Sequence, residues 1–206
     1  MDKFLNREDA ARQLLSLLHS YRSQKDSVVL ALPRGGVPLG RYIADYLLWP
    51  LNIVIVKKIG HPLNPEYAVG SASATGYVIN KHELLPEDYV TTEVARLQRE
   101  IQQKYEVYQR GREPIDPKKK TVLLVDDGMA TGSTMLGAID LVRGQGAKQI
   151  IVAIPVASGE AYRKAARKAD QLLCLATPKS FGAVGQYYQD FGQVSDQEVI
   201  DLLRSD

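Results

Sequence analysis

Residues 121–135 read TVLLVDDGMATGSTM, and they indicate most clearly how this chain folds. Their apolar run, 122–125, predicts a buried parallel strand, and Asp126 and Asp127 stand where that strand ends. Small and hydroxyl residues follow and lead into a helix. Ligands of open parallel sheets bind at the carboxyl ends of the strands, so this turn is a candidate binding site.

The loop at 128–134 has the composition of a phosphate site. A helix N-terminus offers unpaired backbone N–H groups and about half a positive charge. Gly132 lets the backbone come close, and the threonine and serine hydroxyls add donors. Asp126 and Asp127 cannot bind the same anion, because like charges repel. They suit sugar hydroxyls or a hard cation, so a ribose with Mg²⁺ beside a phosphate would satisfy the whole stretch.

The order of apolar strand, acidic pair and Thr-Gly-x-Thr resembles the PRPP-binding motif of the type I phosphoribosyltransferases, where PRPP is 5-phosphoribosyl 1-diphosphate. The resemblance implies that Asp126 and Asp127 contact the ribose hydroxyls and hold Mg²⁺, while residues 130–134 bind the 5-phosphate. An ordinary strand, turn and helix with an Asp-Asp-Gly turn is the alternative interpretation. The substrate-binding residues that the motif implies are Asp126, Asp127, Gly128, Met129, Ala130, Thr131, Gly132, Ser133 and Thr134.

A second glycine-rich turn lies upstream. Residues 33–36 read PRGG and connect a predicted strand, 27–32, to a predicted helix. The glycines expose backbone N–H groups, and Arg34 adds a planar, forked donor suited to phosphate. The turn resembles the pyrophosphate loop of the same family, which implies that Arg34, Gly35 and Gly36 bind pyrophosphate. A tight turn with a solvated arginine is the alternative.

Lys57 and Lys58 follow the next predicted strand, 51–56. Paired lysines at a strand end are ordinarily solvated, but these would face the same sheet edge as Arg34. In the family a basic residue near this point neutralises the pyrophosphate leaving group. The resemblance therefore implies this role for Lys57 or Lys58, and the choice between them stays open.

Residues 60–74 predict a mobile loop followed by a weak strand, since they contain two prolines, an asparagine and glycines. The segment lies where the family keeps a flexible loop that closes over the reaction and excludes water. His61 and Glu66 are its residues with acid or base chemistry, and plain loop roles are the alternative for both. Residues 76–79 predict a short strand that pairs with this segment as a hairpin.

The remaining periodicities predict an α/β fold, a parallel sheet flanked by helices on both faces, Rossmann-like as the resemblance implies. At 206 residues the chain is expected to form a single domain, with its core over about 25–178. The further predicted elements are strands at 149–156 and 171–176, helices at 87–110, 132–143 and 159–169, and helices opening at Asn6 and Ser195.

Residues 179–193 read KSFGAVGQYYQDFGQ and break this alternation. Type I enzymes carry a small hood over the carboxyl edge of the sheet, and flat rings stack well on a nitrogenous base. The resemblance implies that 179–206, with or without the N-terminal helix, forms this hood. It assigns base contacts to Phe181, Tyr187 and Tyr188, and local core packing is the alternative.

Charge, cysteine and histidine content narrow the classes of function. The net charge of +2 gives no strong field for nucleic acid, so no nucleic-acid partner is expected. The one cysteine, Cys174, fits a buried strand in a protein of the reducing cytoplasm. The scattered histidines lack metal-ligand spacing, so any metal would be bound by oxygens. No stretch reaches the roughly 20 apolar residues of a membrane span, and apolar helix faces favour a homodimer.

The resemblance implies an enzyme that transfers the 5-phosphoribosyl group of PRPP to a nitrogenous base, with Asp126, Asp127, Arg34 and Lys58 as catalytic candidates. The identity of the nitrogenous base stays open. Ala130 cannot act as a general acid or base, and its stretch Ala-Thr-Gly-x-Thr resembles that of the adenine and uracil enzymes. The PRGG turn instead resembles that of purine enzymes. The stretches ALPRGGVP and AVGQYYQDF resemble a bacterial branch of predicted phosphoribosyltransferases. A PRPP-sensing regulator on the same fold and a nucleotide-sugar phosphorylase are the alternatives.

Overall fold

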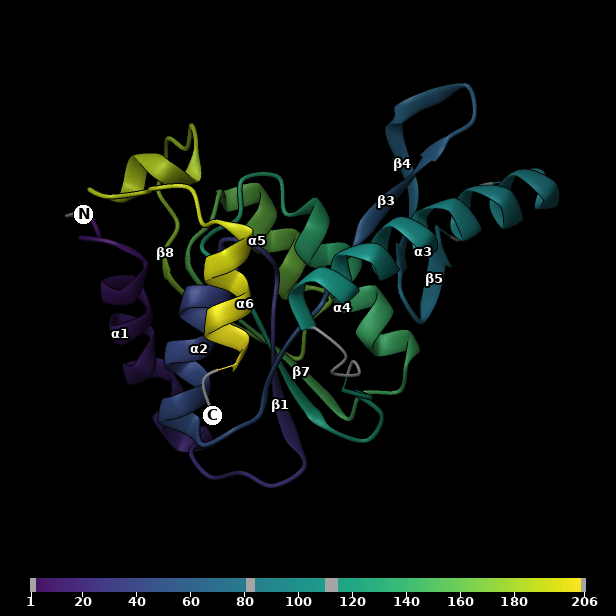
Figure 1. Cartoon of the computed structure of the whole chain (residues 1–206). Helices are drawn as coiled ribbons and strands as arrows, with labels where there is room; N and C mark the ends of the chain where they lie inside the picture. The colour runs from purple at the N-terminus through teal and green to yellow at the C-terminus, as the bar shows by residue number, and fades with distance from the viewer. Residues whose placement is uncertain (1–2, 81–83, 110–114, 205–206) are drawn as a thin grey trace.

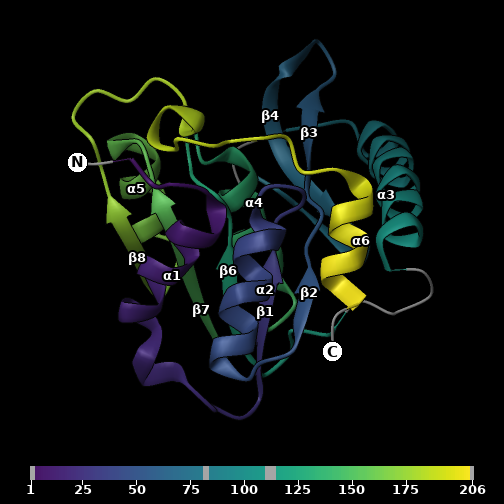
Figure 2. The ribbon, with the colours of Figure 1, turned by 60° about the vertical axis from the view of Figure 1, so that its left-hand side comes forward.

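A five-stranded parallel sheet forms the centre of the molecule. The computed structural model describes residues 3–80, 84–109 and 115–204, without the side chain of Glu66. The strands lie side by side in the order β2-β1-β6-β7-β8, which Figure 2 shows from right to left. Every neighbouring pair is parallel. The strands are β1 (Ser27–Ala31), β2 (Leu51–Ile53), β6 (Thr121–Val125), β7 (Gln149–Val156) and β8 (Gln171–Ala176).

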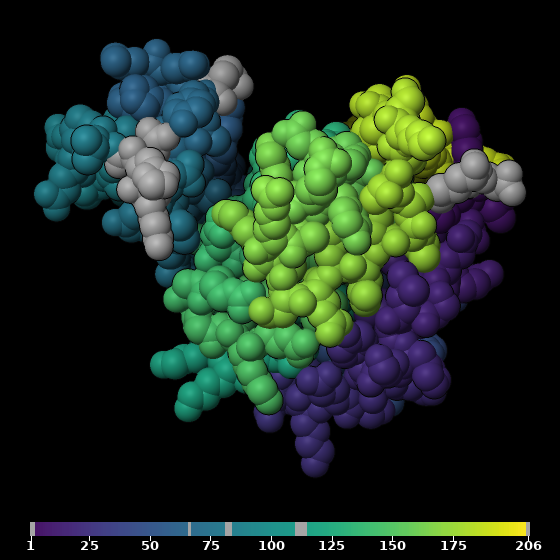
Figure 3. All heavy atoms as spheres, turned by 180° about the vertical axis from the view of Figure 1, so that it is seen from behind, coloured from purple at the N-terminus to yellow at the C-terminus, as the bar shows by residue number. Residues whose placement is uncertain are grey.

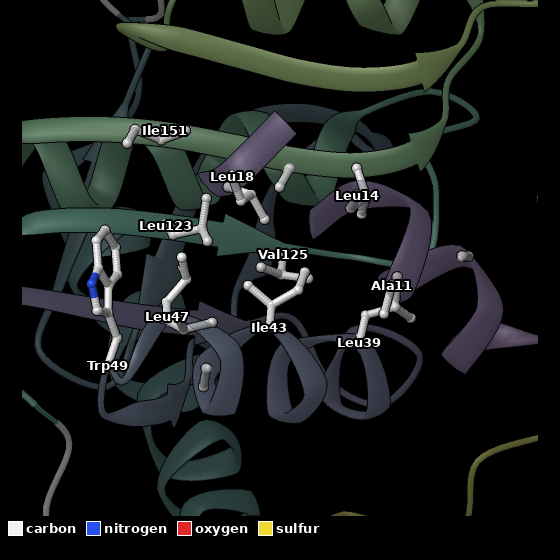
Figure 4. Close-up of a cluster of buried hydrophobic side chains, with 14 of the residues drawn as sticks. Ala11, Leu14, Leu18, Leu39, Ile43, Leu47, Trp49, Leu123, Val125 and Ile151 are labelled. Atoms are coloured by element: carbon white, nitrogen blue, oxygen red, sulfur yellow. The ribbon is translucent and has the colours of Figure 1, made fainter. Parts of the chain in front are cut away.

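Helices cover both faces of this sheet, as the continuous apolar strands predict. On one face Val29, Leu123 and Ile151 pack under the first two helices, and Figure 4 shows Leu123 and Ile151 among the side chains of those helices. On the other face Leu30 and Leu124 pack under two later helices. The four helices are α1 (Arg7–Leu18) and α2 (Gly36–Leu47) on the first face, and α4 (Ser133–Gly144) and α5 (Gly159–Ala166) on the second.

A second, antiparallel sheet projects beside the first. Its strands are β3 (Lys57–His61), β4 (Asn64–Ser73) and β5 (Gly76–Ile79), in that order. It packs with the long helix α3 (Glu87–Gln109) and the last helix α6 (Asp196–Arg204) around a separate apolar cluster. Figure 1 shows the β3–β4 hairpin and the far end of α3 projecting beyond the parallel sheet, and Figure 3 shows the blue and teal atoms of this part as a lobe.

The loop expected at the start of 60–74 is wrong, because this segment is most of the β3–β4 hairpin, whereas the strand expected after that loop is confirmed as part of β4. Its glycines let strands approach: a Cβ on Gly60 would lie 2.6 Å from the Pro65 carbonyl oxygen, and one on Gly70 would lie 2.3 Å from the Val78 carbonyl oxygen. Pro65 lies near the hairpin end, where the pairing register shifts. The predicted pairing of β5 with this segment is confirmed.

The expectation that Lys57 and Lys58 end a strand of the parallel sheet is also wrong. Strand β2 ends at Ile53, and the two lysines open β3 instead. Helix α3 contributes to this break, since the Tyr105 hydroxyl donates to the Ile53 carbonyl oxygen (3.1 Å) and accepts from the Ile55 N–H (3.2 Å). These bonds replace partners that a longer strand would supply.

The chain's N-terminal segment and its late aromatic segment lie together. Phe4 N–H donates to the Tyr187 carbonyl oxygen (2.9 Å), and Gln189 N–H donates to the Phe4 carbonyl oxygen (2.8 Å). A short 3₁₀ helix, η2 (Val184–Tyr187), precedes this pairing. Among the residues that the structure describes, none belongs to a helix both long and apolar enough to cross a membrane.

Candidate active site

The acidic pair lies at the carboxyl edge of the sheet, directly against the PRGG turn. Asp126 and Asp127 follow β6, and the adjacent strand β1 leads into Arg34 and Gly35. A Cβ on Gly35 would lie 2.1 Å from Asp127 Oδ2, so only glycine permits this approach. The peptide bond between Pro33 and Arg34 is cis. The close approach of Gly35 to Asp127 brings the two sequence motifs together.

The loop after the acidic pair is hydrogen-bonded to the end of β7 and to Ser158, and its hydroxyl side chains are exposed. Met129 N–H donates to the Val156 carbonyl oxygen (2.9 Å), and the Ser158 hydroxyl donates to the Ala130 carbonyl oxygen (2.6 Å). Gly132 has a φ of 77°, a left-handed conformation that favours glycine, and it directly precedes α4. The side chains of Thr131, Ser133 and Thr134 are exposed. The first turn of α4 thus presents N–H groups and hydroxyls to the same edge.

Arg7 binds Asp127, a contact that the sequence interpretation missed. Its Nε and Nη2 donate to Asp127 Oδ2 at 3.0 and 2.9 Å, and its Nη1 donates to the Gly192 carbonyl oxygen at 2.7 Å. The guanidinium lies 4.0 Å from the ring centroid of Phe191. One signal was available: Arg7 follows the helix cap Asn6, and a cation at a helix N-terminus opposes the helix dipole.

Burial makes the acidic pair easier to protonate than exposed aspartates. The pKa of Asp126 is raised well above its ordinary value, first by burial and then by the neighbouring Asp127. Burial also raises the pKa of Asp127, although Arg7 opposes that shift. The Tyr188 hydroxyl donates to the Asp127 carbonyl oxygen (2.6 Å) and fixes the backbone there. A hard divalent cation fits such a donor set, because it would replace the proton and offset the repulsion.

The basic residues beside the PRGG turn form a second part of the site. Arg34 lies 3.5 Å from Asp196, measured from Nη1 to Oδ1, and Lys57 forms an ion pair with Glu100. Arg34 and Lys57 line one cavity of about 180 Å³, together with Thr134 of the phosphate loop. Lys58 is exposed and is not among the described residues that line this cavity. Of the two candidate lysines, Lys57 is thus the one that lies at the cavity beside Arg34.

The aromatic residues of the C-terminal segment do not act as one group. Tyr188 is 2% exposed and packs against Phe4 with 5.3 Å between ring centroids, so it cannot stack on a base and is corrected to a core residue. Phe181 and Tyr187 stack on each other at 5.1 Å. Phe191 instead packs against the guanidinium of Arg7, which pairs with Asp127. It lines a cavity of about 460 Å³ with Arg7, Arg34, Gly35, Asp127, Val184, Gly192, Gln193 and Val194.

Comparisons with known proteins agree with this geometry. A family model, the phosphoribosyl transferase domain, matches residues 2–191. The chain belongs to this family. The crystal structure of TT1426 from Thermus thermophilus has 37% sequence identity and a TM-score of 0.90, and the match covers 98% of this chain and 97% of that one.

Curated relatives of the family are longer than this chain. Two Mycobacterium tuberculosis proteins, from strains CDC 1551 and H37Rv, are each named "Putative phosphoribosyl transferase". Each is 38% identical over 208 residues, a match that covers 98% of this chain and 47% of the relative. The chain therefore spans about half the length of these curated relatives.

We expect Asp126→Asn to stabilise the ligand-free protein at neutral pH by on the order of 1 kcal/mol, or about 2–4 °C in Tm. The raised pKa of Asp126 means that the folded state binds the proton more tightly, so stability falls as pH rises through that pKa. Asparagine avoids this ionisation and can still accept from Asp127 N–H. Thermal unfolding at about pH 5 and about pH 8 tests this. A gain that does not grow with pH would contradict it.

We expect Arg7→Met to destabilise the fold by about 2 kcal/mol, because it leaves the Asp127 carboxylate without its ion-pair partner. The side chains of Arg7 and Asp127 are only 13% and 14% exposed. Arg12→Met is the matched control on the same helix, since its pair with Glu8 is exposed and contributes at most about 0.5 kcal/mol. Denaturant unfolding measures both. If the free energy of unfolding fell equally in the two variants, the Arg7–Asp127 pair would stabilise the fold no more than an exposed pair does.

Proposed function

We propose that the chain transfers the 5-phosphoribosyl group of PRPP to a nitrogenous base and releases pyrophosphate, in the cytoplasm and with Mg²⁺. The observation that supports this most strongly is the contact between the two motifs. Gly35 of the PRGG turn lies against Asp127, and the open loop 130–134 lies on the same edge of the sheet. A sugar that carries phosphate at one end and pyrophosphate at the other matches this order of subsites.

Each subsite receives one part of PRPP. The 5-phosphate binds at the loop 130–134 and the N-terminus of α4, where Thr131, Ser133 and Thr134 are exposed. Asp126 and Asp127 accept from the ribose hydroxyls. Arg34 and Lys57 bind the pyrophosphate. When bound, Mg²⁺ would be held by the acidic pair together with PRPP oxygens, and it would stabilise negative charge on the leaving group.

The reaction exchanges one bond at ribose C1 for another. The bond from C1 to the pyrophosphate oxygen breaks, and its electron pair leaves with pyrophosphate towards Arg34 and Lys57. A ring nitrogen of the base attacks C1 from the opposite side, and the 460 Å³ cavity, which extends from Arg34 and Asp127 to Phe191, is the candidate space for the base. In this proposal the attacking nitrogen gives up its proton to water, and Ala130 has no group that could accept it. The chain's contribution is positioning and charge stabilisation.

Release of pyrophosphate tests the proposal. We expect PRPP with Mg²⁺ to release pyrophosphate only when one of a panel of purine and pyrimidine bases is added, and the active base names the substrate. PRPP binding without release for any base would contradict the transferase and favour a PRPP-sensing regulator on the same fold. Full activity of Asp127→Asn would contradict the assignment of the site.

A further inference from the structure

The 180 Å³ cavity beside the PRGG turn has a third cation that the sequence did not indicate. This cation is Lys104, which lies on α3 rather than on a loop of the parallel sheet. Within the described part of the chain, every charged side chain that lines this cavity is basic, and Thr134 of the phosphate loop lies at the same cavity. The cavity therefore joins the pyrophosphate turn, the phosphate loop and the long helix.

Helix geometry places Lys104 between Glu100, which is the ion-pair partner of Lys57, and Tyr108, which contacts the ion-pair partner of Arg34. Glu100, Lys104 and Tyr108 are four residues apart, so they lie along one face of α3. Glu100 pairs with Lys57. The Tyr108 hydroxyl donates to Asp196 Oδ1 (2.8 Å), the same oxygen that lies 3.5 Å from Arg34. One face of α3 therefore follows the basic side of the site.

The position of this face is fixed by burial. Tyr105 and Tyr108 are 6% and 4% exposed, and the Tyr105 hydroxyl bonds to the backbone at Ile53 and Ile55, which leads into Lys57. These contacts hold α3 against the same segment that carries Lys57. Lys104, next to Tyr105, is thus held close to the cavity at its backbone, and its long side chain is exposed.

The three cations differ in whether a carboxylate neutralises their charge. Lys57 has Glu100 and Arg34 has Asp196, whereas Lys104 has no hydrogen bond or ion pair among the described residues. The cavity therefore carries excess positive charge before any ligand binds. A compact anion with several charges would gain from all three cations, because each would make a charge-assisted hydrogen bond with it.

We propose that Lys104 binds the pyrophosphate group of PRPP together with Arg34 and Lys57, an inference that rests on the proposed function. Pyrophosphate takes the electron pair of the broken C1–O bond, so its negative charge grows during the reaction. Lys104 stabilises that charge from the side of α3. The antiparallel lobe and α3 thus contribute directly to the reaction site.

Three ligands separate this role from general damage to the site. PRPP, inorganic pyrophosphate and ribose 5-phosphate are each titrated with Mg²⁺ into the full chain by calorimetry. We expect Lys104→Gln to weaken binding of PRPP and pyrophosphate by about 10- to 100-fold, the effect of losing one charged hydrogen bond. Ribose 5-phosphate lacks the pyrophosphate group, so its affinity stays unchanged.

Two further variants make the result specific. Lys104→Arg keeps the charge and retains most of the pyrophosphate affinity, and Arg99→Gln removes an exposed cation from the same helix with no effect on any ligand. The inference is overturned if Lys104→Gln binds pyrophosphate with unchanged affinity, or if it loses ribose 5-phosphate affinity to the same extent. In either case, PRPP binding by the unaltered chain would preserve the proposed function. Failure of the unaltered chain to bind PRPP and pyrophosphate overturns both.

Discussion

Asp127→Asn is expected to reduce phosphoribosyl transfer by about 100-fold or more. The substitution weakens the charged hydrogen bonds to the ribose hydroxyls, each worth about 1.5–3 kcal/mol, and removes one of the two charges that would hold Mg²⁺. It also leaves Arg7 without its carboxylate. Initial rates of pyrophosphate release at saturating base measure the loss, after circular dichroism has shown that the variant is folded.

The matched control for this variant is Asp140→Asn. Asp140 lies on α4, close in sequence to the phosphate loop, and pairs with Lys168 at the surface. We expect its rate to stay within about twofold of the unaltered protein, because exposed pairs contribute little. If both variants lost activity equally, the acidic pair would have no special role.

Gly35→Ala is expected to reduce PRPP binding by about 100-fold, because its Cβ would lie 2.1 Å from Asp127 Oδ2 and 2.6 Å from Asp127 Cγ. Either the PRGG turn or the carboxylate must move, and both belong to the proposed site. Overpacking of this kind also costs about 1–3 kcal/mol of stability. The φ of Gly35 is −59°, so the loss is steric and not conformational.

Gly144→Ala separates this effect from glycine loss in general. Gly144 lies at the end of α4, and a Cβ there meets nothing within 4 Å. We expect unchanged PRPP affinity and slightly higher stability, since alanine favours helix. Fluorescence or calorimetric titration of both variants with PRPP makes the comparison. Normal PRPP affinity in Gly35→Ala would contradict the proposed position of the ligand.

The parallel sheet and its two turns could be predicted because local signals agreed with the final contacts. Strands β7 and β8 have the predicted bounds, and the two predicted helix starts are capped: Asn6 accepts from Asp9 N–H and Ser195 from Glu198 N–H. Cys174 lies on β8 as predicted, but it is only partly buried. That partial burial raises the pKa of its thiol to about 11, which lowers its reactivity.

The antiparallel lobe could be predicted only in part from the same signals: the pairing of 76–79 with the segment before it was expected, whereas the β3–β4 hairpin was not. Gly60 and Gly70 indicated a loop, yet they serve the close approach of neighbouring strands. Lys57 and Lys58 follow an apolar run that leaves the parallel sheet at Ile53, since Tyr105 takes over the backbone bonds there. Such breaks depend on a helix that lies far along the chain, which no local pattern records.

Contacts between segments far apart in the sequence explain why the structure of the site differs from the one that the sequence predicted. Arg7 reaches Asp127 across 120 positions, and the burial of Tyr188 depends on Phe4. Sequence pattern alone does not distinguish the clustered aromatics, whereas the fold buries Tyr188 and places Phe191 at the same cavity as Arg7 and Asp127. The predicted single-domain division, the Mg²⁺ requirement and the homodimer stay predictions.

The most direct test of the central claim is a calorimetric titration of the unaltered chain with PRPP in the presence of Mg²⁺. We predict saturable binding at a single site, competition by inorganic pyrophosphate, and loss of binding in Asp127→Asn. Absence of binding, or binding that Asp127→Asn leaves intact, would contradict the assignment of the acidic pair and the two turns as a PRPP site.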